Sequence, residues 1–267
     1  MHASPIAETL LLEGPDAGAF AHAQFSSKVD GLAVGRWQFS AWLDAKGRVR
    51  ALFHLARLEE QRYLLLLRGG DAAAMVEALQ RFVFRSRVRL TALPARGLST
   101  GPAQPLHVVT MEGDAVSLGC GSHALLVSAT ASTDDAWRAL QLRDGWPWLP
   151  ASMLGTSLPA ALSLQRLDAV AVDKGCYPGQ EIVARLHFRG GHKRHLHRGT
   201  TSQPVQAGDA LRIDDREVGC VLDVVDGDGA SDVLLVLDDD IAAQLRAGAT
   251  PSFQRALALT LQTSWSA

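Results

Sequence analysis

Alternating apolar and polar residues predict a first part of the chain that is rich in strands. Strands are expected over 8–13, 35–43, 48–57, 61–68 and 87–93, and the turn Asp44–Gly47 joins the second to the third. One helix is expected to follow Gly14-Pro15-Asp16 and run to Gln24, and another to span 72–84 behind a capping Asp71. Residues 94–105 hold three prolines among Gly, Ser and Thr, so we expect a loop or linker there.

The rest of the chain repeats this order and then changes character. Strands are expected near 106–111, 115–118 and 124–129, and a helix from Asp134 to Leu142, so a pseudo-repeat of the first part is one interpretation. From Lys193 onward, short strands and one helix predict a small β-barrel or sandwich, with strands over 196–201, 210–213, 217–225, 233–237 and 257–261 and the helix over 239–246. We therefore expect an α+β protein with two halves, 1–93 and 106–192, a linker at 94–105 and a C-terminal domain at 193–267.

Composition narrows the class of protein. With 267 residues, of which 47% are hydrophobic and 20% charged, the chain is expected to be globular. A net charge of −2 gives no global attraction to nucleic acid or membranes, so any anion site must be local. No basic leader or membrane-length apolar run stands out, which favours a cytoplasmic protein without membrane contact. Three widely spaced cysteines fit neither a disulfide framework nor a metal knuckle, and Cys120 and Cys220, in strand-like surroundings, are expected to be structural.

The segment Asp173–Arg185, Asp-Lys-Gly-Cys-Tyr-Pro-Gly-Gln-Glu-Ile-Val-Ala-Arg, carries the most specific signal. It predicts a tight loop followed by a helix that begins near Gln180. Cys176 then lies just ahead of a helix N-terminus and beside Lys174, and both positive charges favour thiolate over thiol, which lowers the pKa of the sulfur. The alternative interpretation is a buried structural cysteine. Cys176 and Lys174 are the candidate catalytic residues.

The run Arg185–Arg198 that follows is strongly basic. It holds five fixed positive charges, four histidines and no acid, which suggests a site for a phosphate, a carboxylate or a polyglutamate tail. A solvated basic face is the alternative. Since no Cys or carboxylate stands at ligand spacing beside its histidines, no metal is expected. Direct nucleic-acid binding is disfavoured because Phe188 is the one interleaved aromatic residue.

The segment 174–185, continued by Phe188-Arg189-Gly190 and Lys193-Arg194, resembles the signature of the YgfZ family. That family is related to the folate-dependent T-protein of glycine cleavage and to mitochondrial iron–sulfur maturation factors. Weaker similarities are found at Asp44–Arg48, at Trp137 with Arg143–Pro147, and at Pro159–Leu164. The resemblance implies a folate-binding body of two pseudo-related α/β halves with a small C-terminal β-barrel, arranged like a ring around a central hole. We expect a monomer.

The resemblance also implies a function. It points to a folate-binding accessory protein that supports iron–sulfur cluster assembly or repair and, through it, tRNA modification, with Cys176 as the functional thiol. The cofactor would be tetrahydrofolate or a derivative, and the partners would be iron–sulfur clients such as tRNA-thiolating enzymes. Trp137 could stack on the folate ring, although an indole in an amphipathic helix is more often part of the core. The other candidate cofactor-binding residues are Tyr177, Gln180, Glu181, Arg185, Arg189, Lys193 and Arg194.

Several positions depart from the related families. Where T-proteins carry a pair of acids after the Gly47 turn, this chain has Ala51 and Leu52, which cannot hold a proton, so aminomethyl transfer by that mechanism is not expected. A folate-dependent one-carbon transferase using Asp44 or Glu181 stays open as the alternative function. The remaining departures are Ala160 and Ser163 in place of Gln and Asn, Lys28 in place of Asp, and Ala7 in place of an aromatic residue.

Overall fold

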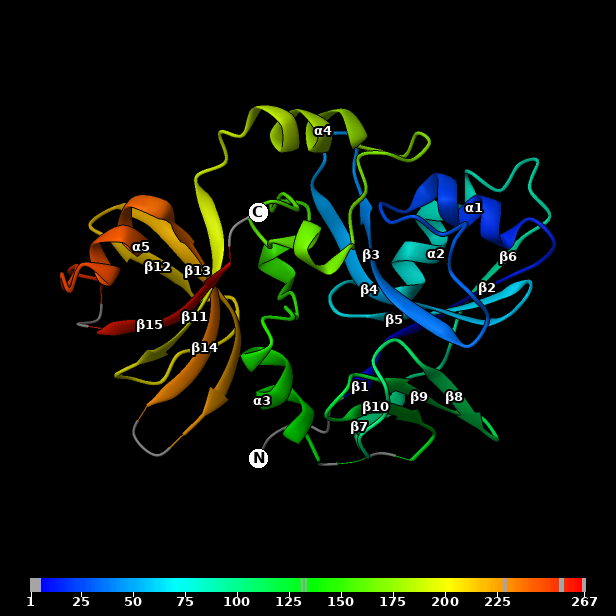
Figure 1. The fold of residues 1–267 in the computed structure, drawn as a ribbon, viewed down its shortest axis with the longest axis horizontal. Helices are drawn as coiled ribbons and strands as arrows, with labels where there is room; N and C mark the ends of the chain where they lie inside the picture. Colours follow the sequence, from blue (N-terminus) through cyan, green and yellow to red (C-terminus); the bar gives the residue numbers. More distant parts are fainter. Residues whose placement is uncertain (1–5, 131, 133, 228–229, 255–256, 266–267) are drawn as a thin grey trace. The chain divides into compact units, whose positions relative to one another are not determined.

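The computed structural model describes the chain except for residues 1–5, 131, 133, 228–229, 255–256 and 266–267 (Figure 1). The chain divides into two compact units that are interleaved along the sequence. The first unit comprises the chain up to Leu43, Arg50–Trp137 and Asp168–Pro178, and the second comprises Asp44–Val49, Arg138–Leu167 and the chain from Gly179 onward. The domain boundaries expected from the sequence stay a prediction.

The first sheet of the first unit has the strand order β3-β4-β5-β2-β6. Its strands are β2 (Thr9–Glu13), β3 (Arg36–Leu43), β4 (Val49–Glu59), β5 (Arg62–Leu67) and β6 (Arg89–Ala92). Alternate residues of β4 and β5 point to one face, where they form a core with helices α1 (Ala17–Gln24) and α2 (Ala72–Gln80) (Figure 1). As predicted, the Asp71 carboxylate caps α2, accepting a hydrogen bond from the N–H of Ala74.

Helix α2 ends four residues earlier than the predicted 72–84. Leu79 is the last fully buried residue of its apolar face, and the aromatic rings of Phe82 and Phe84 beyond it are exposed. Continuing the helix would therefore bury little further apolar surface, and the chain forms turns instead.

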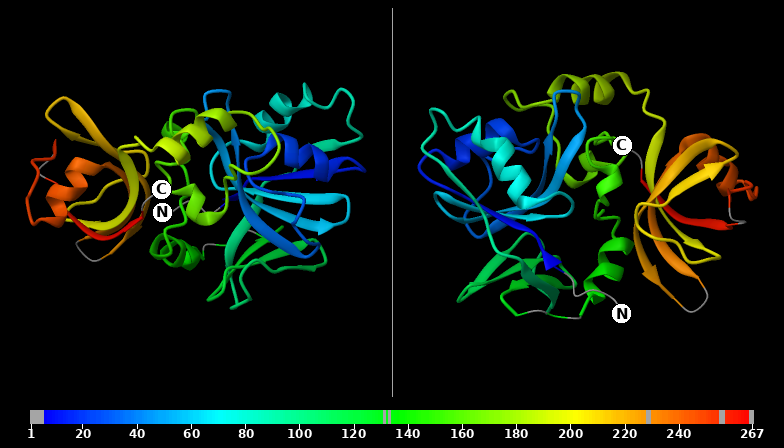
Figure 2. Two further views of the ribbon diagram at one scale, coloured as in Figure 1. Left: turned by 45° about the horizontal axis from the view of Figure 1, so that its top comes forward. Right: turned by 180° about the vertical axis from the view of Figure 1, so that it is seen from behind.

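The second sheet of the first unit has the order β1-β7-β10-β9-β8 (Figure 2). Its strands are β1 (Ile6–Ala7), β7 (Arg96–Gly101), β8 (Val109–Glu112), β9 (Ala115–Gly119) and β10 (Ala124–Ser128). The prediction of a loop or linker at 94–105 is wrong as to the loop over residues 96–101, because β7 pairs there with both β1 and β10. Its three prolines lie outside the strand, so every backbone N–H from residue 96 to residue 101 is free to pair.

The second unit contains the C-terminal strands in one antiparallel sheet, ordered β12-β13-β14-β11-β15. These are β11 (Arg194–Thr201), β12 (Ala210–Ile213), β13 (Arg216–Asp226), β14 (Ser231–Asp238) and β15 (Leu259–Trp265), and the unit also holds α4 (Gln180–Arg189), α5 (Asp239–Arg246) and most of α3 (Ala136–Arg143). The strands pack an apolar core against α5, and Val221, Leu235 and Ile241 belong to it.

The C-terminal strands and helix lie close to their predicted positions. Each strand predicted after Lys193 is present with its ends moved by a few residues, and the helix 239–246 has the predicted bounds. Barrel closure, the relation between two halves and a ring-like arrangement stay predictions. In the described part of the chain, no helix is long and apolar enough to cross a membrane.

Candidate functional site

The loop that carries the signature is tied to the segment after α1. The Ser26 hydroxyl donates a hydrogen bond to the carbonyl oxygen of Ala169 at 2.6 Å, and the N–H of Ala171 donates to the Ser26 carbonyl at 2.8 Å. Further along the loop, the Tyr177 hydroxyl donates to the Ala171 carbonyl at 2.8 Å. Burial raises the pKa of Tyr177, so this hydroxyl stays a donor. The loop 168–178 is therefore anchored at its start and again beside Cys176.

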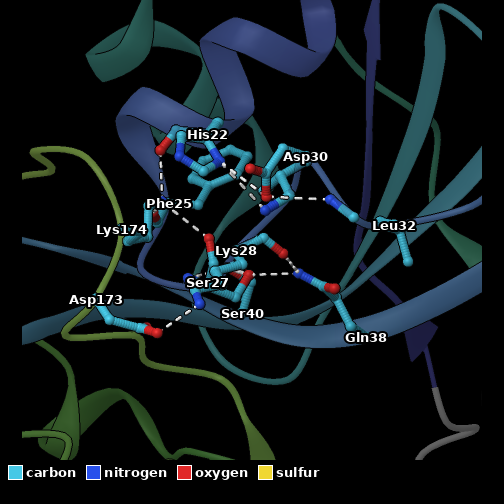
Figure 3. Close-up of polar contacts among 12 residues, drawn as sticks. His22, Phe25, Ser27, Lys28, Asp30, Leu32, Gln38, Ser40, Asp173 and Lys174 are labelled. Carbon is cyan, nitrogen blue, oxygen red and sulfur yellow. Dashed lines mark hydrogen bonds and ion pairs between the residues drawn. The ribbon is translucent and has the colours of Figure 1, made fainter.

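Lys174 supplies the strongest anchor. Its Nζ donates to the carbonyl oxygens of His22 at 2.5 Å, Phe25 at 2.6 Å and Ser27 at 2.8 Å (Figure 3). The carbonyls in the last turn of a helix have no partner within it, and the end of the helix dipole is negative there, so a cation at the end of α1 is stabilised twice. Burial lowers the pKa of Lys174 to about 8, and the ammonium form still predominates at neutral pH.

A polar layer lies beneath this anchor (Figure 3). The Gln38 amide donates to the Ser27 hydroxyl oxygen at 2.7 Å and to the Lys28 carbonyl at 2.5 Å, and the Ser27 hydroxyl donates to that of Ser40 at 2.7 Å. At the surface, Nζ of Lys28 forms an ion pair with the carboxylate of Asp173 at 2.6 Å, which lowers the pKa of that carboxylate. These contacts fix the 25–28 segment that receives Lys174.

Cys176 is exposed, whereas Cys120 and Cys220 are both buried. Burial raises the pKa of Cys220 to about 11, which makes it a poor nucleophile at neutral pH. The sulfur of Cys120 points at the Leu118 carbonyl at 3.3 Å within its own sheet. Cys176 is therefore the thiol that a reagent or partner can reach.

Glycines fix the start of α4 in the second unit. Gly179, the residue before the helix, has φ +79°, and a Cβ there would lie 2.5 Å from the Asp44 carbonyl oxygen and 2.6 Å from the Cα of Gly47. Gly47 is equally constrained, with φ +74° and a Cβ position 3.0 Å from the side chain of Ile182. Two motifs quoted separately from the sequence, the Asp44–Arg48 turn and the Gly179 turn, thus pack against each other.

Helix α4 presents an exposed basic side. Arg185, Arg189 and the following Lys193 are exposed, and no Asp or Glu of the described residues forms an ion pair with them. Gln180 is half-buried at the first position of the helix. Glu181 is exposed in the first turn, where the helix dipole stabilises its negative charge. We call Arg185, Arg189 and Lys193 the α4 cations.

The rest of the basic run is neutralised inside the C-terminal sheet. Nε of Arg194 lies 2.5 Å from the carboxylate of Asp238, and Arg198 pairs with Asp232 at 3.0 Å. His195 lies 2.6 Å from the carboxylate of Asp239, and burial lowers the pKa of His197 to about 4. The predicted anion-binding run is thus divided, and Arg194 already has internal partners. Among the described residues, no group of three or more His, Cys, Asp or Glu could hold a metal ion.

The remaining sequence-selected residues are buried or engaged in their own turn. Trp137 is 1% exposed, and its backbone N–H donates to the Thr100 hydroxyl at 2.9 Å. Ala51 and Leu52 lie in the protein interior. The carboxylate of Asp44 accepts hydrogen bonds from the backbone N–H groups of residues 46 and 48, both at 2.8 Å, and so shapes its own turn. These positions offer no acid poised for proton transfer.

Sequence reasoning missed the base of the loop. Ser26, Ser27 and Gln38 carry no motif. Ser26 and Ser27 contact the loop across about 140 residues of sequence, and Gln38 holds Ser27 in place through its hydroxyl. The available signal was the pair of serines directly after the predicted end of α1, where polar side chains often bind backbone groups. The loop presents one exposed thiol, and along the sequence it is followed by helix α4, whose cations have no carboxylate partner among the residues that the structure describes.

Comparisons with known proteins agree with the signature. A tRNA-modifying protein YgfZ from Sodalis glossinidius is 28% identical over 287 residues, covering 88% of this chain and 87% of that protein. One from Escherichia coli (strain UTI89 / UPEC) is 35% identical over 147 residues, which cover 52% of this chain and 44% of that protein. An uncharacterized protein of Haemophilus influenzae is 25% identical over 245 residues, 87% of each chain. No family model matches the chain.

A solved structure shares the fold. The glycine cleavage system aminomethyltransferase T from Bartonella henselae superimposes with a TM-score of 0.68, covering 87% of this chain and 76% of that one at 17% sequence identity. The predicted α+β class is confirmed as a mixture of helices with three antiparallel sheets, similar to that aminomethyltransferase. At this identity the likeness concerns the fold alone.

Proposed function

We propose, starting from the resemblance of this chain to the YgfZ proteins over most of its length, that it is a folate-binding accessory protein with Cys176 as its functional thiol. It would support assembly or repair of iron–sulfur clusters and, through client enzymes that thiolate tRNA, tRNA modification. The similar proteins named tRNA-modifying proteins support the last step. The observation that carries the proposal is that Cys176, within the signature, is exposed while the other two thiols are buried. The proposal keeps the cytoplasmic location and monomeric state predicted from the sequence.

Cys176 would act as a nucleophile or a ligand presented to a partner. Exposure gives access, and the anchored loop limits the conformations that the sulfur can sample, which lowers the entropic cost of meeting a partner. In this proposal Lys174 is a positioning residue, because its three donors are directed at backbone carbonyls. The catalytic contribution predicted for Lys174 is thus expressed through the geometry of the loop.

Tetrahydrofolate is the proposed cofactor, and the aminomethyltransferase-like fold supports it. Because Trp137 is 1% exposed, the side chains that cover its indole would have to move for it to stack on the ring system of folate. Tyr177 would line the same site. Gln180 and Glu181 would supply polar contacts. The α4 cations would receive the glutamate tail, since they are exposed and carry no carboxylate partner in the described part of the chain.

The alternative, a one-carbon transferase, lacks a base. Ala51 and Leu52 hold no proton, and the Asp44 carboxylate is engaged by two backbone N–H groups of its turn. Glu181 is an exposed carboxylate in the first turn of α4. Formation of methylene-tetrahydrofolate from an aminomethyl donor, abolished in a Glu181→Gln variant, would support the enzyme instead.

Complementation tests the role of the thiol. Cells that lack their own related protein should regain iron–sulfur enzyme activity and tRNA thiolation with the wild-type chain, and should not regain them with Cys176→Ala. The matched control is Cys220→Ala, which removes a buried thiol and should complement. Full activity of Cys176→Ala, at equal protein level, would refute the proposed role of this thiol.

A further inference from the structure

The connection between α2 and β6 displays two aromatic rings and three arginines. Residues 81–88 read Arg-Phe-Val-Phe-Arg-Ser-Arg-Val, and all three arginines are exposed. Phe84 is 89% exposed and Phe82 is 40% exposed. In Figure 1 this connection, in blue-green, lies at the edge of the first unit. We call residues 81–85 the arginine–phenylalanine loop.

The backbone of this loop is held by contacts at Val83 and just beyond its end. The N–H of Ser86 donates a hydrogen bond to the carbonyl oxygen of Val83 at 2.9 Å, and the Val83 side chain packs against the core of the first unit. The N–H of Arg87 donates to the Asp16 carboxylate at 2.7 Å, and its guanidinium forms an ion pair with the same carboxylate at 3.2 Å. The rings on either side of Val83 are therefore carried by a backbone with fixed contacts.

The two arginines inside the loop have no carboxylate partner. Arg81 and Arg85 form no ion pair within the part of the chain that the structure describes. The guanidinium carbon of Arg81 instead lies 4.9 Å from the ring centroid of Phe82, and that of Arg85 lies 5.9 Å from the ring centroid of Phe84. Each cation thus lies beside an aromatic ring, and its N–H donors are available to an anion.

Rings and cations side by side suit a ligand that presents flat apolar groups and anions in alternation. A single nucleic-acid strand does so, because its bases stack on aromatic side chains while arginines bind its phosphates. Phe82 and Phe84 are two residues apart, so their Cα atoms lie within about 7 Å, a span that neighbouring nucleotides can bridge. Nucleic-acid binding was disfavoured for the run 185–198 because Phe188 is its one aromatic residue, and the arginine–phenylalanine loop meets the condition that this run fails.

An anionic membrane surface also attracts arginines and aromatic rings. In a bilayer, rings sink to the acyl boundary while guanidinium groups stay with the headgroup phosphates, so the two separate in depth. The pairs of Arg81 with Phe82 and of Arg85 with Phe84 would then have to open. The apolar tip is also small, because Val83 between the rings packs against the protein core. The loop therefore favours a strand over a membrane.

We propose that the arginine–phenylalanine loop binds an unpaired stretch of RNA, with a base stacked on Phe84 and flanking phosphates bound by Arg81 and Arg85. The single-stranded form follows from the exposed rings, because the bases of a duplex already stack on one another. The choice of RNA over DNA rests on the proposed function, in which the protein supports tRNA modification. With two phosphate contacts, the binding constant should fall with the salt concentration raised to a power of about 1.4.

The probe is a fluorescein-labelled RNA of about twelve uridines, titrated with the full chain and followed by fluorescence anisotropy. In low salt we expect saturable binding with a Kd of about 10–100 µM, since few phosphates and one or two bases are engaged. An abasic strand of the same length and charge should bind at least about fivefold more weakly, because it leaves nothing to stack on the rings. Absence of saturable binding up to about 0.3 mM protein overturns the proposal, as does equal affinity for the abasic strand.

Replacing one ring separates stacking from apolar contact. Phe84→Leu keeps an apolar side chain without a ring, and it should weaken RNA binding about fivefold while the unfolding temperature stays unchanged, because the ring is 89% exposed. The matched control is Phe188→Leu, which removes a ring that is 74% exposed and should bind RNA like the wild type. A Phe84→Leu chain with wild-type affinity overturns the proposal. So does an equal loss in Phe188→Leu.

A pair of double variants locates the phosphates. Arg81→Gln with Arg85→Gln should make the affinity for RNA almost independent of salt. Arg185→Gln with Arg189→Gln removes the same charge from α4 and should leave the salt dependence as it is. Equal effects of the two double variants would overturn the assignment to this loop.

The remaining arms separate this inference from its competitors. Sedimentation with vesicles of phosphatidylcholine and phosphatidylglycerol that is the same for wild type and Phe84→Leu, without binding of the RNA, would assign the loop to membranes and overturn the proposal. Cys176→Ala should bind the RNA like the wild type, because Cys176 lies outside the loop. Failure of RNA binding therefore leaves the proposed role of the thiol standing, and failure of the thiol in complementation leaves RNA binding standing.

Discussion

Replacing Lys174 by methionine tests the anchor of the signature loop most severely. The change keeps the length of the side chain and removes an ammonium that donates to three backbone carbonyls. An unpaired acceptor costs about 1–3 kcal/mol when it is buried, and less when water reaches it. Because the ammonium is half-buried, we take the low end for each of three carbonyls, about 3 kcal/mol in total. For a chain of this size that corresponds to a fall in Tm of about 6–12 °C.

The assay is thermal unfolding of three lysine variants at pH 7. Lys46→Met changes an exposed residue of a turn and should unfold within about 0.5 kcal/mol of wild type. Lys28→Met removes an exposed, solvent-screened ion pair with Asp173 and should unfold close to wild type. A Lys174→Met protein that unfolds within 2 °C of Lys28→Met would refute the assignment of Lys174 as the principal anchor.

Three further predictions concern reactivity, charge and pH. At pH 7, iodoacetamide should alkylate Cys176 at least tenfold faster than the two buried thiols, as measured by mass spectrometry of peptides, and equal rates would contradict its exposure. Triglutamyl tetrahydrofolate should bind more tightly than the monoglutamate in low salt, and the double change Arg185→Gln, Arg189→Gln should erase that advantage. The pKa of His197 is lowered to about 4 in the folded chain, so between pH 6.5 and pH 4 the unfolded chain binds one more proton than the folded chain. The free energy of unfolding should therefore decrease by about 3 kcal/mol as the pH is lowered from 6.5 to 4. Denaturant unfolding should show a shallower pH slope for His197→Gln than for the exposed control His187→Gln.

Most helices and strands could be predicted from the sequence, because their positions follow the local alternation of apolar and polar residues. The strands of both units and α5 follow the periodic placement of apolar residues that the core requires. Strand β7 was missed because Pro94 and Pro102 make their surroundings resemble a loop, while pairing with β1 and β10 is a tertiary effect.

The site was accessible only in part. The signature identified Cys176, whose exposure agrees with the interpretation as a reactive thiol rather than a buried structural one. The partners of Lys174 are backbone carbonyls about 150 residues away, and no side-chain pattern encodes them. The division of the basic run was also hidden, since Arg194 meets Asp238 across 44 residues and the pairing of β11 with β14 creates that contact.

Calorimetric titration with tetrahydrofolate tests the central claim most directly. The account predicts one saturable tetrahydrofolate site per chain. Its affinity should be unchanged in Cys176→Ala, because the thiol is proposed to contact the partner and not the cofactor. Trp137→Phe, which keeps a buried aromatic ring but removes the larger indole, should weaken binding severalfold. Absence of binding heat at millimolar tetrahydrofolate, for a protein that unfolds cooperatively, would contradict the account.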